Sequence, residues 1–380
     1  LDLSNGPIVV EVPAGTGPGT VNDAFFRFVV DMGGPGPDRG QGGKYLIVGP
    51  GQTTPANTDG YFVANTPSKI NWLILRGFLD DEGKTDTARN AFRGGLKVYP
   101  YALRANPPAN NFKNLTDWET NTIHANNFKF YEELDEVIQR EPSDLFSPEL
   151  LGMASSIGIE KGKPFNPSPE QKALLTEAVA IGNATARSIL FGPKDPKNYI
   201  YPGKAGYWQT GFPGGSHEYL VNQGNGGRDM DGRTLFFYLA TVNTPAMALE
   251  IPGVGSQYAF SSRDGSGAYL NGSNTYKLNI PANPPAQRFW SFVVYDPQTR
   301  AMLQSDDMPY PSKNNKRNTD MVKNADGSID LYFGPQAPAG KETNWVKTVP
   351  GKGWFGIFRL YGPGQEWFDR TWKLGDIEKV

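Results

Sequence analysis

The sequence predicts a mainly β protein with a helical insert, and two kinds of pattern indicate this. Toward both ends, runs rich in β-branched and aromatic residues, such as Phe289–Tyr295 and Trp354–Tyr361, alternate with Gly and Pro turns. In the middle, apolar residues recur at helical spacing. We therefore expect a β module over residues 1–124, a mostly helical connecting region over 125–250 and a second β module over 251–380.

The first module is expected to consist of short strands separated by Gly and Pro loops, followed by one helix. The strands are expected at Pro7–Val12, Ala24–Asp31, Lys44–Val48, Gly60–Asn65 and Asn71–Phe78, and the helix at Thr85–Val98. Gly and Pro suit the intervening turns because they adopt or fix the backbone angles that turns require.

The connecting region is expected to be mostly helical from about residue 125 to 192. Apolar side chains recur at helical spacing at Phe128, Tyr131, Leu134 and Ile138. Ser147 and Ser168 each precede a Pro-Glu pair, which is typical of a capped helix start. Thr234–Leu249 is expected to be a further helix, although its aromatic and β-branched residues fit a strand nearly as well.

The second module is expected to be an antiparallel sheet structure, because Asp-Pro, Asp-Gly and Gly-Pro turns separate its apolar runs. Its strands are expected at Gln257–Phe260, Phe289–Tyr295, Ile329–Phe333 and Trp354–Tyr361, with a hairpin arm at Tyr269–Ile280.

The two β modules share a weak internal similarity. KYLIVGPG (Lys44–Gly51) and YFVANTPSKINWLILRGF (Tyr61–Phe78) parallel IDLYFGPQ (Ile329–Gln336) and NWVKTVPGKGWFGIFRLYG (Asn344–Gly362). Each copy has a strand, a Gly-Pro turn, a proline and a strand that contains Trp and Arg. Either a duplication or the common composition of strands and turns produces such a match.

Composition indicates a folded, loop-rich protein with more than one core. The 380 residues include 45 Gly and 32 Pro, but 38% are hydrophobic, which leaves ample apolar surface to bury. Single cores usually stop growing near about 250–300 residues, so two domains are expected.

The charge and residue types exclude several functions. A formal net charge of −2 provides no long-range field for nucleic acid. The absence of Cys removes thiolate nucleophiles and Cys-zinc sites. No apolar run approaches the ~20 residues of a transmembrane helix. The opening residues, LDLSNGPIVVEVP, look like the middle of a sheet, so we expect further N-terminal sequence, either removed with a signal peptide or lying upstream.

Several segments resemble a known bacterial family. They are FFRFVVDMGGPGPDRGQGGKYLIVGPG, NTIHANNFKFYEELDEVIQ, GNATARSILF and the C-terminal block from RFWSFVVYDPQ onward. The family combines two domains of unknown function, numbered twelve-fifty-four (N-terminal) and twelve-fourteen (C-terminal). The resemblance implies two jelly-roll-like β-sandwich modules joined by helices, often in a homo-oligomer, and an export signal. It implies no particular reaction and supplies no catalytic residue.

The two histidines offer few routes to catalysis. His217 begins a sequence like the zinc-protease helix motif, but Val221 stands where the second His is required, which excludes that reading. His124 precedes a helix that carries Glu132 and Glu133, so a His-carboxylate pair for proton transfer is one interpretation. The alternative, which we favour, is that His124 caps the helix or satisfies a loop carbonyl.

The loop Gly33–Gly43 lacks the spacing of a nucleotide-binding loop, since Tyr45 follows Lys44 where Ser or Thr is needed. It offers Asp31, Asp38 and Arg39 as candidate ligand-binding residues, because functional side chains gather in loops. The alternative is a wide turn with an Asp38–Arg39 surface pair, and this is the more frequent outcome.

Arg187 lies in an Ala-rich apolar run and must find a partner if it is buried. It is a candidate catalytic residue with His124 and could bind a substrate carboxylate, or it pairs with a structural acid, the ordinary outcome. Trp208 and Tyr258 are candidate aromatic platforms for a ligand.

No cofactor or metal site is expected. The segment NGGRDMDG (Asn225–Gly232) resembles a calcium loop, but its spacing puts Gly227 and Tyr238 at positions that require oxygen ligands. A non-standard Ca²⁺ site at Asp229 and Asp231 stays open, with a polar turn as the favoured alternative.

These observations lead to three functional hypotheses. The first is an exported, periplasmic or secreted protein that binds or hydrolyses a glycan or other small molecule between the two β modules. The second is a non-catalytic envelope or surface protein that assembles into a homo-oligomer, which covers strand edges and apolar surface. The third is a metal-dependent enzyme that relies on carboxylates.

Overall fold

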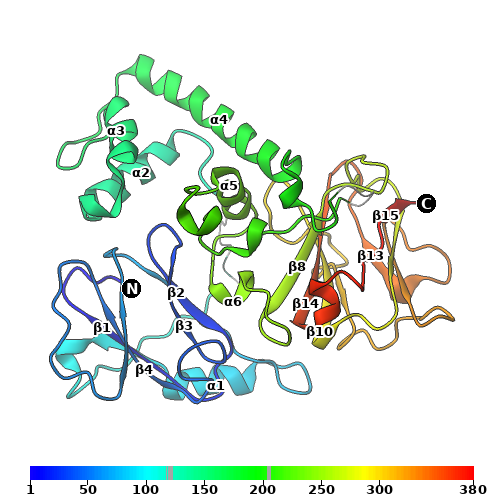
Figure 1. Cartoon of the computed structure of the whole chain (residues 1–380), viewed down its shortest axis with the longest axis horizontal. Coiled ribbons are helices and arrows are strands. Elements are labelled where there is room, and N and C mark those ends of the chain that lie inside the picture. The colour runs from blue at the N-terminus through cyan, green and yellow to red at the C-terminus, as the bar shows by residue number, and fades with distance from the viewer. Residues whose placement is uncertain (117, 119–122, 203–206) are drawn as a thin grey trace. The chain divides into compact units, whose positions relative to one another are not determined.

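The computed structural model describes residues 1–116, 118, 123–202 and 207–380, and they form two compact units (Figure 1). The first unit consists of Leu1–Thr120, His124–Asn183 and Val242–Thr244. The second consists of Asn121–Ile123, Ala184–Thr241 and Pro245–Val380. Residues of the expected connecting region therefore occur in both units.

The first unit contains two sheets that share a core. Their strands are β1 (Ile8–Val12), β2 (Gly19–Asn22), β3 (Phe28–Met32), β4 (Gly43–Val48), β5 (Tyr61–Asn65), β6 (Trp72–Ile74) and β7 (Lys97–Pro100). One sheet has the order β5-β4-β1-β7 and the other β3-β2-β6. Val10 and Tyr45 from the first sheet pack with Val21 and Met32 from the second. Because side chains alternate along a strand, Val9 and its neighbours pack on the opposite face.

Helices complete the first unit. They are α1 (Asp86–Gly95), α2 (Lys129–Arg140), α3 (Pro148–Ser156) and α4 (Pro169–Phe191), the last of which continues into the second unit. Ser147 caps α3 by accepting from the Leu150 N–H at 3.3 Å, as its sequence predicts. Helices α2 to α4 share a core to which Phe25 of the β2–β3 loop contributes.

A buried carboxylate joins α2 to the β module of the first unit. Glu141, directly after α2, is 1% exposed and accepts backbone hydrogen bonds from Lys69 at 2.6 Å and Ile70 at 2.9 Å. Lys161 Nζ donates to the carbonyls of Ile138, Gln139 and Glu141. Several carbonyls at this helix end are therefore satisfied, and the helix end is held to the loop after β5.

The second unit contains two four-stranded sheets. Their strands are β8 (Ser256–Ser261), β9 (Tyr276–Ile280), β10 (Ala286–Tyr295), β11 (Ser312–Asn314), β12 (Ile329–Gly334), β13 (Trp345–Lys347), β14 (Phe355–Pro363) and β15 (Ile377–Lys379). The sheets have the orders β11-β10-β14-β8 and β13-β12-β9-β15, and a large aromatic core lies between them. The end of α4 and helix α5 (Met230–Leu239) cover the outer face of β8 and β14.

The two β modules have matching topology. Sheet β5-β4-β1-β7 corresponds to β13-β12-β9-β15, and β3-β2-β6 corresponds to β11-β10-β14, in the same chain order. All pairings are antiparallel except β4–β5 and β12–β13, which are both parallel. After these pairs, Thr66 and Thr348 each donate to the facing strand, to Val48 and Gly334 at 3.0 Å. A shared composition does not set strand order, so the topology favours duplication of an ancestral module.

The structure corrects several element boundaries. The expected helix Thr85–Val98 ends at Gly95, because two consecutive glycines disfavour helix, and Val98 belongs to β7. Residues 24–27 form a turn before β3 rather than a strand, since Asp23 accepts from the Phe25 and Arg27 N–H groups. Strand β2 lies in a segment for which no strand was expected.

The helix expected over Thr234–Leu249 is interrupted. Helix α5 ends at Leu239 and a short helix, α6 (Pro245–Ala248), follows. The intervening residues 240–244, ATVNT, contain β-branched side chains and precede Pro245, and both features disfavour continued helix.

We predict that Glu141→Gln lowers the free energy of unfolding of the first unit by about 1–3 kcal/mol, because the amide N–H₂ would face a buried backbone donor that then lacks an acceptor. Urea unfolding followed by circular dichroism measures this change. Glu136→Gln, at an exposed position on the same helix, is the matched control and should change stability little. Equal stability of the two variants would show that the hydrogen bonds from Lys69 and Ile70 to the Glu141 carboxylate do not stabilise the first unit.

Candidate functional site

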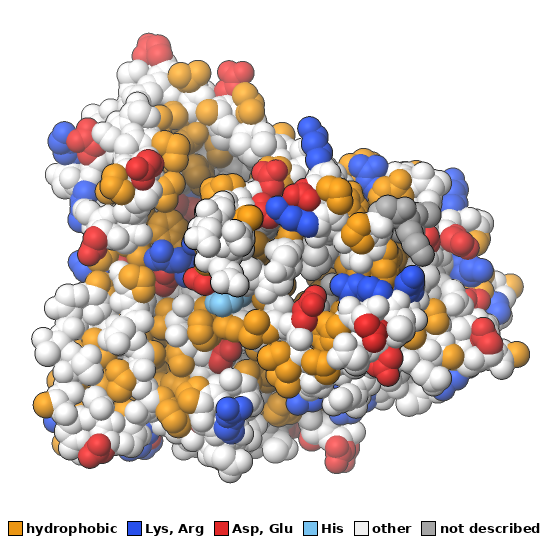
Figure 2. Space-filling model, in the orientation of Figure 1, with side chains coloured by type: hydrophobic (Ala, Val, Ile, Leu, Met, Phe, Trp, Pro, Cys, Tyr) orange, Lys and Arg blue, Asp and Glu red, His pale blue; other side chains and the backbone are white. Residues whose placement is uncertain are grey.

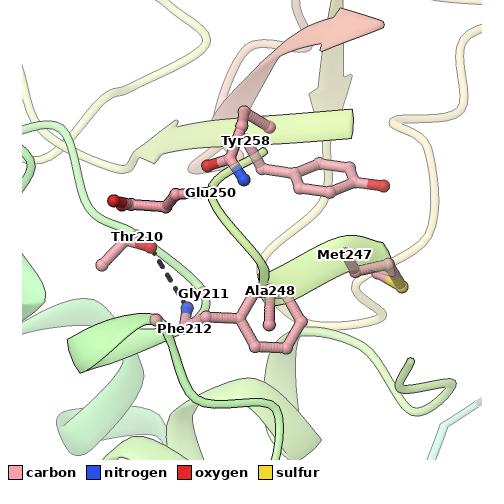
Figure 3. A pocket seen from close by; sticks show the side chains of 9 residues that line it. Thr210, Gly211, Phe212, Met247, Ala248, Glu250 and Tyr258 are labelled. Carbon is pink, nitrogen blue, oxygen red and sulfur yellow. Dashed lines mark hydrogen bonds between the residues drawn. The ribbon is translucent and has the colours of Figure 1, made fainter. Parts of the chain in front are cut away.

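A cavity of about 170 Å³ opens within the second unit. Its lining consists of Lys197, Tyr199, Ile200, Thr210, Phe212, Gly214, Gly215, Glu250, Gln257, Tyr258, Trp367 and Arg370. A narrow recess shares part of this lining and adds Gly211, Met247 and Ala248 (Figure 3). Ligand sites for drug-sized molecules usually have about 300–1,000 Å³, so this cavity suits a smaller ligand.

The lining comes from four chain segments that are far apart in sequence. Residues 197–200 span the end of the short helix η3 (Pro196–Asn198) and the residues after it, and segment 210–215, which ends in η4 (Pro213–Gly215), precedes α5. The segment 250–258 joins α6 to β8, and Trp367 belongs to α7 (Gln365–Phe368). Backbone hydrogen bonds hold the first two segments in place: Ile200 donates to Trp208, and Gln209 and Phe260 exchange a pair at 2.8 and 3.1 Å.

Both signs of charge line the cavity. Lys197 Nζ forms ion pairs with Asp195 at 2.9 Å and Asp229 at 3.0 Å, and hydrogen bonds to these carboxylates raise its pKa. Arg370 stacks on Trp367, with its guanidinium carbon 5.5 Å from the ring centre. Within the described part of the chain, the carboxylate of Glu250 has neither an ion pair nor a hydrogen bond.

Aromatic and neutral polar groups complete the lining. Glu250 and Tyr258 lie on one side of the recess, and the Phe212 ring and Ala248 lie on the other (Figure 3). The Thr210 hydroxyl accepts a hydrogen bond from the Phe212 N–H at 3.1 Å, and the amide of Gln257 adds a donor and an acceptor. The cavity therefore offers donors, acceptors and aromatic rings to one small molecule.

The two residues predicted to be aromatic platforms, Tyr258 and Trp208, lie in different environments. Tyr258 lines the cavity. The expectation for Trp208 was wrong, because its side chain is only 1% exposed and packs in the core between the two sheets. Its indole N–H donates to the Gly375 carbonyl at 2.9 Å. The N–H of a buried Trp usually has such a hydrogen-bond partner.

The predicted residues of the first glycine-rich loop belong to the first unit. Asp38 does not present its carboxylate to a ligand: it is 5% exposed, and it accepts from the Tyr45 hydroxyl at 2.5 Å and from the Gly42 N–H at 3.1 Å. Arg39 is exposed and has a positive φ of 52°. The Asp38–Arg39 ion pair expected as the alternative does not form among the described residues.

Asp31 is a buried residue, and one oxygen of its carboxyl group accepts no hydrogen bond among the described residues. It is 7% exposed, and its Oδ1 atom has no hydrogen-bond partner among the residues that the structure describes. Burial raises its pKa to about 6, although the hydroxyls of Thr20 and Thr244 partly oppose this. Such a perturbed group fits a functional or a strained structural position, so its ligand-binding role stays a prediction.

His124 and Arg187 belong to different units, so their predicted pairing stays a prediction. His124 is half-buried and makes interactions of its own. Arg187 Nη1 donates to the Pro297 carbonyl at 3.1 Å. No carboxylate among the described residues forms an ion pair with Arg187, so the structural acid expected as its ordinary partner is not seen there.

Asp229 acts as a helix cap. Its carboxylate accepts from the Gly232 N–H at 3.0 Å at the start of α5 and pairs with Lys197. Across the described ranges, no group of three or more His, Asp or Glu side chains could hold a metal ion. No helix in these ranges is long and apolar enough to cross a membrane.

Most of the cavity lining was not predicted from the sequence. No motif or spacing marks Glu250, Gln257 or Arg370 in the sequence. The only feature of the sequence that pointed to the lining was the type of residue, namely aromatic and charged residues in loops near a strand. That feature identified Tyr258 and also the wholly buried Trp208.

Comparison with known proteins identifies the family. Residues 1–100 match the family described as protein of unknown function (DUF1254), and residues 255–365 match the family described as protein of unknown function (DUF1214). The chain belongs to the two-domain family that combines them. No curated protein matches the sequence.

Two crystal structures are similar to the chain. The VPA0106 protein from Vibrio parahaemolyticus is 20% identical, with a TM-score of 0.56 over 100% of this chain and 87% of that one. An uncharacterized protein from Burkholderia cenocepacia is 12% identical, with a TM-score of 0.42 over 98% and 72%. The first likeness concerns the fold alone.

We predict that Asp31→Asn stabilises the first unit at pH 7. The folded pKa of about 6 lies above the ordinary value of 3.8, so the folded state favours the protonated acid, and ionisation between these values destabilises it. The upper estimate is on the order of 3 kcal/mol, from 1.36 kcal/mol per pKa unit.

Urea unfolding of both proteins at pH 4 and pH 7 tests this prediction. The stability advantage of Asp31→Asn should be small at pH 4, grow as the pH rises from about 4 to 6, and be complete at pH 7. Asp59→Asn, at an exposed carboxylate of the same unit, should show no such dependence. A variant that loses stability at pH 7 would show that the carboxylate is needed in its charged form.

Proposed function

We propose that this protein binds a small polyhydroxylated molecule, such as the terminal sugar of a glycan, in the cavity of the second unit. The single observation that supports this most is the combination of Glu250 and Arg370 with aromatic side chains around one small cavity. Sugar hydroxyls both donate and accept hydrogen bonds, so they can use a carboxylate and a guanidinium together. The apolar faces of a sugar ring can pack on Tyr199 or Tyr258.

Binding is proposed in preference to hydrolysis. Glycoside hydrolysis usually requires two carboxyl groups about 5–10 Å apart. The lining contributes one carboxylate, that of Glu250, while Asp195 and Asp229 are engaged with Lys197. We place this binding in the periplasm or outside the cell, as the sequence predicts. The interdomain location predicted from the sequence remains an expectation.

We predict that Tyr258→Ala weakens binding of the sugar by about tenfold or more, because it removes aromatic contact area. A glycan array would identify the sugar, and isothermal titration calorimetry would measure the dissociation constant. Tyr310→Ala is the matched control, since Tyr310 is 72% exposed and does not line the cavity.

The outcomes separate this function from its alternatives. Loss of binding in Tyr258→Ala and Glu250→Gln, with wild-type affinity in Tyr310→Ala, would support the site. Absence of binding across the array and of ordered ligand density in soaked crystals would reject it. If the protein released free sugar from the bound glycan, its function would be hydrolysis of the glycan and not binding alone.

Assembly into a homo-oligomer is a second candidate, supported by apolar side chains on the helices of the first unit. Phe130, Leu150, Met153 and Leu174 are 43–65% exposed, and apolar side chains are visible on this helical part (Figure 2). Exposed apolar patches of this kind often mark interfaces.

We predict that multi-angle light scattering at micromolar concentration gives a mass above that of the monomer, and that Met153→Glu with Leu174→Glu lowers it. Lys129→Glu, a charge change at an exposed site of α2, serves as the control. A monomeric wild-type protein would exclude this role.

A further inference from the structure

Two arginines of the second unit converge on one turn. Arg187 lies near the end of α4, and Arg300 lies in the connection between β10 and β11. Arg187 Nη1 donates to the carbonyl of Pro297 at 3.1 Å, and Arg300 Nη1 donates to the carbonyl of Gln298 at 3.4 Å. These carbonyls belong to consecutive residues, whose Cα atoms are about 3.8 Å apart. The two guanidinium groups therefore donate to carbonyls of successive peptide units in the same turn.

No acidic side chain neutralises this pair. Neither arginine forms an ion pair with a carboxylate in the part of the chain that the structure describes. The acid of the same turn, Asp296, is already paired with Lys352 at 3.2 Å and accepts from the Gln298 N–H at 2.7 Å. Two cations without an acid are unfavourable when partly buried.

Arg300 is held in place by its surroundings. Its guanidinium carbon lies 4.2 Å from the centre of the Tyr238 ring, while Arg187 lies over Phe191 at 5.8 Å. Arg300 also adopts a positive φ of 59°, a conformation that is uncommon for residues other than glycine. Burial lowers the pKa of Arg300 and the neighbouring charge of Arg187 lowers it further, while the charge of Tyr238 and its hydrogen bond to Arg300 partly oppose this.

One donor of this pair is unsatisfied. The Nη2 atom of Arg300 is shielded from solvent and has no hydrogen-bond partner among the described residues. Buried donors are almost always paired, and an exception calls for an acceptor that the chain does not provide. The remaining donors of two guanidinium groups suit the oxygens of a carboxylate or phosphate, which they can bind with two parallel hydrogen bonds.

We propose that Arg187 and Arg300 form a binding site for a small oxyanion, a phosphate group or a carboxylate. None of its residues lines the cavity described above, so this site does not depend on the proposed sugar binding. The anion neutralises both cations and accepts from the donors that the turn carbonyls leave unused. Tyr238 and Phe191 provide the aromatic wall behind them.

Isothermal titration calorimetry of the intact chain at low ionic strength tests the site with inorganic phosphate and, separately, with succinate. We expect a dissociation constant of about 1 mM or lower for at least one of them. Arg300→Gln and Arg187→Gln should each weaken it about tenfold or more, the effect of losing a charge-assisted contact. Binding of phosphate alone or of succinate alone assigns the class of anion.

Arg288→Gln is the matched control, because Arg288 is an exposed arginine on β10 of the same unit. It should bind like wild type. Circular dichroism must show that the variants are folded. The titration of the wild-type protein tests anion binding even if a variant does not fold. Absence of wild-type binding of both anions up to about 10 mM, or an equal loss in Arg288→Gln, would overturn the proposal.

Discussion

The aromatic core between the two sheets of the second unit is the packing on which its other features depend. Trp208, Trp290, Trp354 and Trp367 are all nearly inaccessible to solvent there. Burial of large aromatic side chains contributes strongly to stability. Trp208 and Trp367 also anchor segments outside the sheets, and both segments contribute to the cavity. The core therefore fixes the positions of Tyr199, Thr210 and Arg370.

The matching topology of the two modules shows how one scaffold can carry different surfaces. The corresponding strands form the two sheets and the core of each module. The cavity lining of the second unit comes largely from segments outside these strands, at 197–200, 210–215, 250–258 and 367–370. Such connecting segments usually vary more than the strands that they join, although Ile200 and Trp367 of these segments contribute to the core. In a duplication of this kind, the strands keep the fold while the connecting segments of the second copy form the cavity.

Charged side chains are accommodated in several ways in the two units. In the first unit, Glu141 is buried and its carboxylate is fully engaged by backbone donors, whereas Asp31 is buried with one oxygen unsatisfied. In the second unit, several arginines stack on aromatic rings instead of pairing with acids, including Arg263 over Tyr269 at 4.1 Å and Arg300 over Tyr238. Stacked guanidinium groups keep N–H donors available at their edges. The anion site is proposed in the second unit because Arg187 and Arg300 lie together there and the Nη2 donor of Arg300 lacks a partner among the described residues.

The sequence alone determined the β-rich character of both ends, the helices after Ser147 and Ser168, most strand positions and the family, because these depend on local periodicity, capping residues and segment similarity. It also identified Arg187 and Tyr258 as residues of interest. Tertiary structure decided that Trp208 is buried, that Asp38 serves its own loop, and that Arg300 lies beside Arg187. These outcomes depend on contacts between residues up to 167 positions apart, and local sequence patterns carry no information about such contacts.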